Sequence, residues 1–180
     1  MEGKKKLGEE RRNLILNWLK NSNDPLTGQQ LAEKMKVSRQ VIVQDISLLK
    51  AKNEPIIATA QGYVYINDKE SNHLHRRIIA CFHLPQQTQN ELNILVDHGV
   101  FVNNVIVEHS IYGELTASLL LKNRRDVQQF IIKVGETKAA YLSELTGGVH
   151  LHTIEAETEE QLDEACKTLE KKGFLLSKTE

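Results

Sequence analysis

The sequence is poor in cysteine and has no long apolar run. Cys81 and Cys166 are the only cysteines among 180 residues, too few for a disulfide framework, so a reducing cytoplasm is the expected compartment. No apolar run approaches the ~18–20 residues of a membrane span. The basic first residues, MEGKKKLGEERR, lack the apolar segment of a signal peptide. With 40% hydrophobic and 26% charged residues, we expect a soluble globular protein with no membrane partner.

Motifs that define common enzyme classes are also missing. The chain has no Walker sequence, no GxSxG and no glycine-rich nucleotide loop, and Gly147-Gly148 is expected to be a turn. HEXXH and the cysteine-based zinc spacings are absent too. A metal-dependent hydrolase with Glu108 or Glu155 as its base is the least favoured interpretation, because it also needs a substrate pocket. We therefore expect a protein that is not an enzyme.

The near-neutral total charge of −1 conceals two halves of opposite sign. Residues 1–70 carry 12 Lys+Arg against 9 Asp+Glu, and residues 71–180 carry 11 against 15. A polar stretch at 67–72 lies between them. This asymmetry predicts two modules with different partners, at residues 1–68 and 73–180.

Hydrophobic residues recur at helical spacing in three segments of the first module. Thr27 and Gln30 form a capping box at the start of the second helix, and Ser38 caps the third. Two short strand-like runs flank Gly62 and predict a hairpin. The expected elements are helices through 14–19, after 27 and over 39–52, then strands over 56–60 and 63–66. Two helices joined by a short turn and followed by a hairpin form a winged helix-turn-helix.

The third helix carries the residue types of a DNA-reading helix. A major groove ~12 Å wide accepts one helix. Arginine and lysine can reach phosphates or guanine, glutamine can read adenine, and valine can meet a thymine methyl group. The candidate DNA-binding residues are Arg39, Gln40, Val43, Gln44, Ser47 and Lys50. A winged helix used only for protein contact or dimerisation is the alternative.

The second module alternates strands and helices. Strands are expected at 77–82, 100–108, 115–121 and 149–155, and helices at 86–98, 125–135 and 159–172, with a possible last strand at 174–176. The order βαββαβ with a terminal helix predicts an α+β sandwich of the split βαβ type.

The histidines, all seven of which follow residue 72, favour a metal site. His150 and His152 lie two apart on a predicted strand, so their rings share one face ~6–7 Å apart. His83, at the end of the first predicted strand, and Glu91, in the next helix, are the further candidate ligands. Zn²⁺, Ni²⁺ and Co²⁺ suit such a donor set. The alternative is that His150 and His152 are simply two polar residues on an exposed face of the strand.

A third histidine-containing segment lies at another strand end. His109, Tyr112 and Gly113 are candidates to line a small-molecule pocket, where the glycine allows close approach. A plain turn with a hydrogen-bonded histidine explains the same residues equally well.

Four stretches carry a resemblance to a known family. Residues 27–49 resemble the winged helix of biotin-repressor-like regulators, and the stretches CFHLP, VIVEHSIYGEL and GGVHLHTIEA resemble the 3H domain. The whole arrangement resembles the NiaR family of niacin-responsive transcriptional repressors. The resemblance implies a transition-metal site (Ni or Zn) formed by His83, Glu91, His150 and His152. It also implies nicotinic acid as co-repressor of genes for NAD biosynthesis and niacin uptake.

Two further expectations concern partners. One reading helix offers few base contacts, so we expect a homodimer on a palindromic double-stranded DNA operator, paired through the second module. A metal sensor, in which the ion itself is the effector, stays open beside the nicotinic-acid interpretation.

Overall fold

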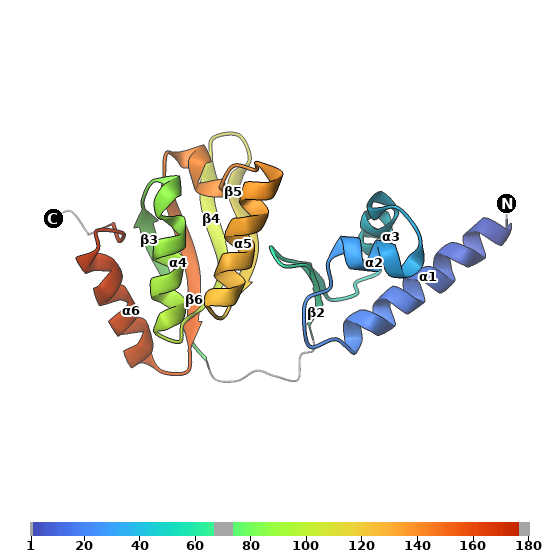
Figure 1. The fold of residues 1–180 in the computed structure, drawn as a ribbon, viewed down its shortest axis with the longest axis horizontal. Coiled ribbons are helices and arrows are strands. Elements are labelled where there is room, and N and C mark those ends of the chain that lie inside the picture. Colours follow the sequence, from blue (N-terminus) through green and yellow to red (C-terminus); the bar gives the residue numbers. More distant parts are fainter. Residues whose placement is uncertain (1, 67–73, 177–180) are drawn as a thin grey trace. The chain divides into compact units, whose positions relative to one another are not determined.

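The computed structural model describes residues 2–66 and 74–176 and divides the chain into two compact units, residues 1–70 and 71–180 (Figure 1). The polar stretch expected as a linker lies outside the described residues. No helix among the described residues is long and apolar enough to cross a membrane.

The first unit has the predicted order of three helices and a hairpin. Thr27 accepts from the Gln30 backbone N–H while the Gln30 side chain accepts from the Thr27 N–H, so the capping box is present. Ser38 caps the third helix through Val41 N–H. The elements are α1 (Glu2–Lys20), α2 (Gly28–Met35), α3 (Arg39–Ala51), β1 (Ile56–Ala58) and β2 (Tyr63–Tyr65).

The core of the first unit is built from the apolar faces of these helices. Its buried members are Ile15, Leu19, Leu31, Ala32, Ile42, Ile46, Leu49 and Ile56. Gly62 lets the hairpin approach the segment before α2, because a Cβ there would lie 2.7 Å from the Leu26 carbonyl. Leu26 and Tyr63 exchange both backbone hydrogen bonds, at 3.0 and 2.8 Å. The hairpin is thereby attached to the helices as a wing.

An ion pair joins α1 to α3. Arg11 Nε donates to Asp45 Oδ2 at 2.5 Å and its Nη2 donates to Oδ1 at 3.2 Å, while Arg12 lies 3.4 Å away. The Asp45 side chain is only 3% exposed. The hydrogen bond to Asp45, partly opposed by burial, raises the pKa of Arg11. The one acidic residue of α3 is thus turned inward and leaves the outer face of the helix without negative charge.

The second unit is a four-stranded antiparallel sheet with helices on one face (Figure 1). The spatial order is β3-β6-β4-β5, and every neighbouring pair is antiparallel. Both βαβ connections therefore skip one strand, as the split βαβ type requires. The strands are β3 (His75–Phe82), β4 (Phe101–His109), β5 (Gly113–Leu121) and β6 (Val149–Ala156), and the helices are α4 (Thr88–Asp97), α5 (Arg124–Thr137) and α6 (Glu159–Lys171).

Three local features of the second unit differ from the sequence-based expectation. The possible strand at 174–176 is only a bridge between Leu175 and Cys81. The strand expected at 77–82 already begins at His75 as β3. The helix expected at 86–98 begins with a short 3-10 helix, η1 (Pro85–Gln87), and a second one, η2 (Leu142–Thr146), was not predicted, because a segment of five residues is too short to show a helical period.

We predict that burial, rather than hydrogen-bond length, decides which ion pair stabilises the fold. Asp45→Ala removes the acceptor for buried hydrogen bonds and is expected to lower the free energy of unfolding by ~1–3 kcal/mol. Asp97→Ala breaks a pair of nearly the same length, Arg124–Asp97 at 2.6 Å, that is largely exposed. No measurable change is expected there. Urea unfolding of both variants checks this, and equal losses would contradict it.

Candidate metal and effector site

Four side chains from three parts of the second unit converge on one point. His83 directly follows β3, Glu91 lies on the buried face of α4, and His150 and His152 lie on β6. Since β3 and β6 are neighbours with Cys81 opposite His150, the end of β3 lies beside the start of β6. All four are buried, at 3, 0, 3 and 2% exposure. The structure thus brings together all four predicted ligands.

The three imidazoles face one carboxylate. His83 Nε2 lies 2.7 Å from Glu91 Oε2, and His150 Nε2 lies 3.3 Å from Oε1. His152 Nε2 lies 3.4 Å from Oε2 but lacks hydrogen-bond geometry, and it has no other partner among the described residues. Neighbouring rings are edge-on, with centroids 4.8 Å apart for His83–His150 and 4.9 Å for His150–His152.

The other ring nitrogen of each histidine is held by the backbone. Nδ1 of His83 lies 2.9 Å from the Leu84 carbonyl, that of His150 lies 2.9 Å from Gly148, and that of His152 lies 2.7 Å from Asn104. A carbonyl oxygen only accepts, so each Nδ1 carries the proton and donates. In the neutral ring Nε2 then has its lone pair directed at Glu91. Each lone pair needs a proton or a cation.

The electrostatics of the metal-free cluster follow from this arrangement. Burial opposes ionisation of Glu91, but the facing imidazoles, His152 foremost, outweigh it and hold the pKa of Glu91 well below its usual value. Burial also disfavours imidazolium, yet the Glu91 carboxylate raises the pKa of both His83 and His152. The cluster therefore favours a cation, whether proton or metal ion, next to the carboxylate.

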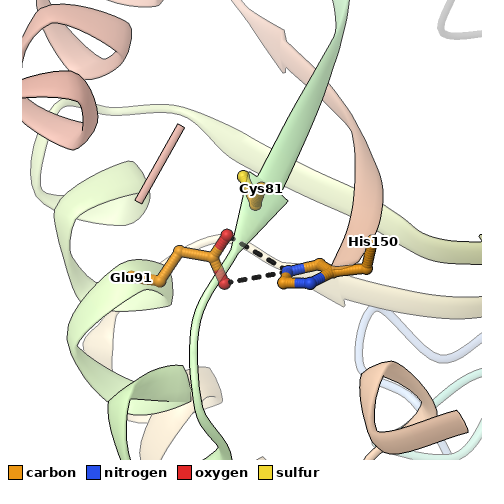
Figure 2. A group of neighbouring side chains, drawn as sticks. All are labelled: Cys81, Glu91 and His150. Atoms are coloured by element: carbon orange, nitrogen blue, oxygen red, sulfur yellow. Dashed lines mark hydrogen bonds and ion pairs between the residues drawn. The ribbon is translucent and has the colours of Figure 1, made fainter. Parts of the chain in front are cut away.

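The spacing of the donor atoms suits a transition-metal ion. Ligands ~2.1 Å from a common ion lie roughly 3.0–3.4 Å apart, and each of the three Nε2 atoms lies 2.7–3.4 Å from an oxygen of Glu91. Cys81, which sequence reasoning did not select, adjoins the group: ligand atoms of Cys81, Glu91 and His150 lie within 4.8 Å of one another (Figure 2). Burial, and then the charge of Glu91, raises the pKa of the Cys81 thiol. In its neutral form the thiol is a poor metal ligand.

Gly148 allows the two strand ends to meet. Its carbonyl accepts from His150 Nδ1, and a Cβ at this position would lie 2.5 Å from the His83 carbonyl oxygen. Its φ of +104° is also unfavourable for residues other than glycine. Gly147, the preceding residue, has a φ of +64° but no heavy atom within 4 Å of such a Cβ.

A pocket opens beside the cluster. About 310 Å³ of space, part of it open solvent, lies in and in front of this pocket, and His83, Glu91, His150 and His152 form part of its wall. Phe130 and Tyr141 supply aromatic surface, with ring centroids 6.0 Å apart. Its other lining residues are Thr88, Leu92, Val105, Leu119, Leu142 and Ser143. Phe130 lies on α5, and Tyr141, Leu142 and Ser143 lie at η2, so the sequence pattern does not bring them together.

The predicted effector residues lie elsewhere, at the turn of the β4–β5 hairpin. His109 Nδ1 accepts from the backbone N–H of Ile111 and Tyr112 at 3.2 and 3.3 Å, so His109 shapes the turn. Tyr112 is 73% exposed. His109, Tyr112 and Gly113 are not among the lining residues of the pocket. Their effector role stays a prediction.

The other residue sets lie where the strand and helix periods place them. Glu155, a candidate base in the least favoured interpretation, pairs with Arg76 at 3.4 Å and points to the opposite face of the sheet from His150 and His152. The six predicted DNA-reading side chains lie on the outer face of α3. Arg39, Gln40, Gln44, Ser47 and Lys50 are exposed, and Val43 is half-buried.

Comparison with known proteins identifies both units. Residues 11–64 match the family model of an HTH domain, and residues 76–178 match that of the 3H domain. The chain is 55% identical over 173 residues to the transcription repressor NadR of Bacillus subtilis, covering 96% of both chains. It is 40% identical over 172 residues to the probable transcription repressor NiaR of Thermotoga maritima, covering 96% of this chain and 97% of that protein.

An HTH domain followed by a 3H domain defines a DNA-binding regulator of transcription. Since both relatives are matched over nearly their whole length, the chain belongs to the NadR/NiaR family of transcription repressors. The resemblance noted from the sequence is thereby confirmed.

The raised and lowered pKa values predict how stability depends on pH in chelator-treated protein. The contribution of His83 and His152 is fully present below their unfolded value near 6.5 and is lost as pH rises through their raised pKa. That of Glu91 is present above 4.5 and is lost as pH falls through its lowered pKa. Urea unfolding from pH 9 down to ~pH 2 checks both slopes, and Glu91→Gln should flatten them. Unchanged slopes in that variant would contradict the assignment.

Gly148 and Gly147 form a matched pair for a second prediction. Gly148→Ala forces a methyl group into the His83 carbonyl and is expected to cost more than ~2 kcal/mol of stability. Gly147→Ala meets no neighbour, so only the left-handed backbone penalty of ~1–2 kcal/mol applies. Thermal unfolding of both variants measures the difference, and equal losses would show that the close approach is unimportant.

Proposed function

We propose that the chain is a transcription repressor that responds to nicotinic acid through a divalent transition ion, Ni²⁺ or Zn²⁺, held in its 3H domain. The ligands would be His83, Glu91, His150 and His152. The observation that carries this proposal is the convergence of three Nε2 atoms on one fully buried carboxylate, at 2.7–3.4 Å. Such an ion supplies a Lewis-acidic position at the wall of the pocket.

The pocket supports a small flat aromatic acid as effector. Phe130, Tyr141 and four aliphatic side chains offer apolar contact to a ring, while the ion end attracts a carboxylate. An ion acting alone as effector would not require this aromatic wall. We therefore favour nicotinic acid bound beside the ion over metal sensing, and over binding at the His109–Gly113 turn.

The DNA contact of the proposal rests on α3. Its outer face presents Arg39, Gln40, Val43, Gln44, Ser47 and Lys50, and its one carboxylate is held inward by Arg11. These residues would read an operator of double-stranded DNA in the major groove. The genes proposed to be repressed are those of NAD biosynthesis and niacin uptake.

A homodimer is part of the proposal. The sheet face opposite the helices carries three exposed apolar side chains: Ile78 is 62% exposed, Phe82 45% and Val149 43%. Pairing of this face with a second copy would bury these side chains and present two α3 helices to a palindromic operator. Sedimentation of the untagged protein reports the dimer.

The decisive measurement is operator affinity with nicotinic acid, with nicotinamide and with neither. Metal-loaded wild type is expected to gain roughly 5–150-fold with nicotinic acid, because a coupling of ~1–3 kcal/mol is typical of allosteric sites. Nicotinamide lacks the negative charge and should couple weakly. The His150→Ala/His152→Ala double variant should lose both the ion and the response, whereas His109→Ala/Tyr112→Ala should keep both.

Each other outcome points to a different mechanism. An operator affinity that depends on the ion but not on nicotinic acid would establish the metal-sensor alternative. A response abolished only in the His109→Ala/Tyr112→Ala variant would place the effector at the hairpin turn. If elemental analysis finds no metal in the untagged protein, the metal part of the proposal is overturned.

A further inference from the structure

Two buried side-chain polar atoms lack a hydrogen-bond partner within residues 2–66 and 74–176, namely Thr88 Oγ1 and His152 Nε2. Both residues line the same pocket. The His152 atom is accounted for by the proposed ion. Thr88 does not belong to the ligand set and needs a separate explanation.

The Thr88 hydroxyl neither caps a helix nor makes a hydrogen bond within the described residues. Thr88 is the first residue of α4 and lies 7% exposed, one helical turn before Glu91 and on the same face. Its backbone N–H donates to the Pro85 carbonyl, and the N-cap position belongs to Gln87. An unpaired buried hydroxyl destabilises a protein. A threonine here is therefore explained by a partner that comes from outside the chain.

The charges of the pocket decide which ligand group reaches this hydroxyl. Among the described lining residues there is no lysine or arginine to bind a carboxylate, and the proposed ion beside Glu91 would take that part. The ring nitrogen of a pyridine carboxylate is neutral, accepts a hydrogen bond and, in the meta position, cannot share the same ion with the carboxylate.

We propose that Thr88 is the specificity-determining residue for the effector and donates its hydroxyl proton to the ring nitrogen. The inference rests on the proposed function, since it takes a metal-bound pyridine carboxylate as the ligand. It divides recognition into two parts: the ion binds the carboxylate, and Thr88 distinguishes a pyridine ring from a benzene ring of the same shape.

The test compares nicotinate with benzoate, which differs only at the ring nitrogen, by calorimetric titration of nickel- or zinc-loaded protein. Wild type should bind nicotinate more tightly than benzoate. Thr88→Val, which has the same shape, should weaken nicotinate binding by roughly three- to tenfold, the value of one net hydrogen bond, and leave benzoate binding unchanged. Thr88→Ser keeps the hydroxyl and should restore the preference for nicotinate.

Two controls separate recognition from structure. Metal content of Thr88→Val should equal that of wild type, and its ligand-free thermal midpoint should not fall, because the hydroxyl it loses is unpaired. If Thr88→Val changes the affinity for both ligands equally, or leaves the affinity for nicotinate unchanged, the proposed role of Thr88 is overturned while the proposed function still stands. Wild type that binds neither ligand while loaded with metal would overturn both this inference and the proposed function.

Discussion

The fully buried carboxylate of Glu91 is the constraint on which the second unit depends. An isolated charge at this depth is strongly unfavourable unless cations or hydrogen-bond donors face it. Three imidazoles from two strand ends supply that environment, and backbone carbonyls fix the orientation of each ring. The four groups are therefore interdependent: displacing one leaves the others buried without their partner.

The split βαβ topology makes this arrangement possible. The first and last strands of the unit are sheet neighbours, so the end of β3 and the start of β6 lie side by side although they are far apart in sequence. The period of the strand then places His150 and His152 on the face that α4 covers. Gly148 permits the close backbone contact at the junction, and without it His83 could not sit beside His150.

Strong periodicity made most elements and two of the site residues, His150 and His152, predictable from the sequence. The capping box, the helical apolar spacing and the H-x-H pattern each reflect a local rule, whereas His83 and Glu91 were candidates from their places after a strand and in the next helix, and the family resemblance joined all four into one ligand set. The pocket was not predictable, because Phe130, Tyr141 and Ser143 come together only through tertiary packing around η2. The inward turn of Asp45 was missed for the same reason: its partner Arg11 lies on another helix. For His109 a turn and a pocket predict the same residue types, so sequence alone could not separate them.

The three helices of the second unit differ in how many residues they bury, and this difference determines which helix the proposed ligand would affect most. Within the described chain, α4 has five buried residues and α6 has three, whereas α5 has only Val127. Phe130 on α5 and Tyr141 after it line the pocket together with the imidazole–carboxylate cluster. A ring bound between the two would attach the least buried helix to the most constrained part of the sheet. Part of the free energy of binding would then offset the entropy that α5 loses on becoming ordered, because α5 is the helix of this unit with the fewest buried residues.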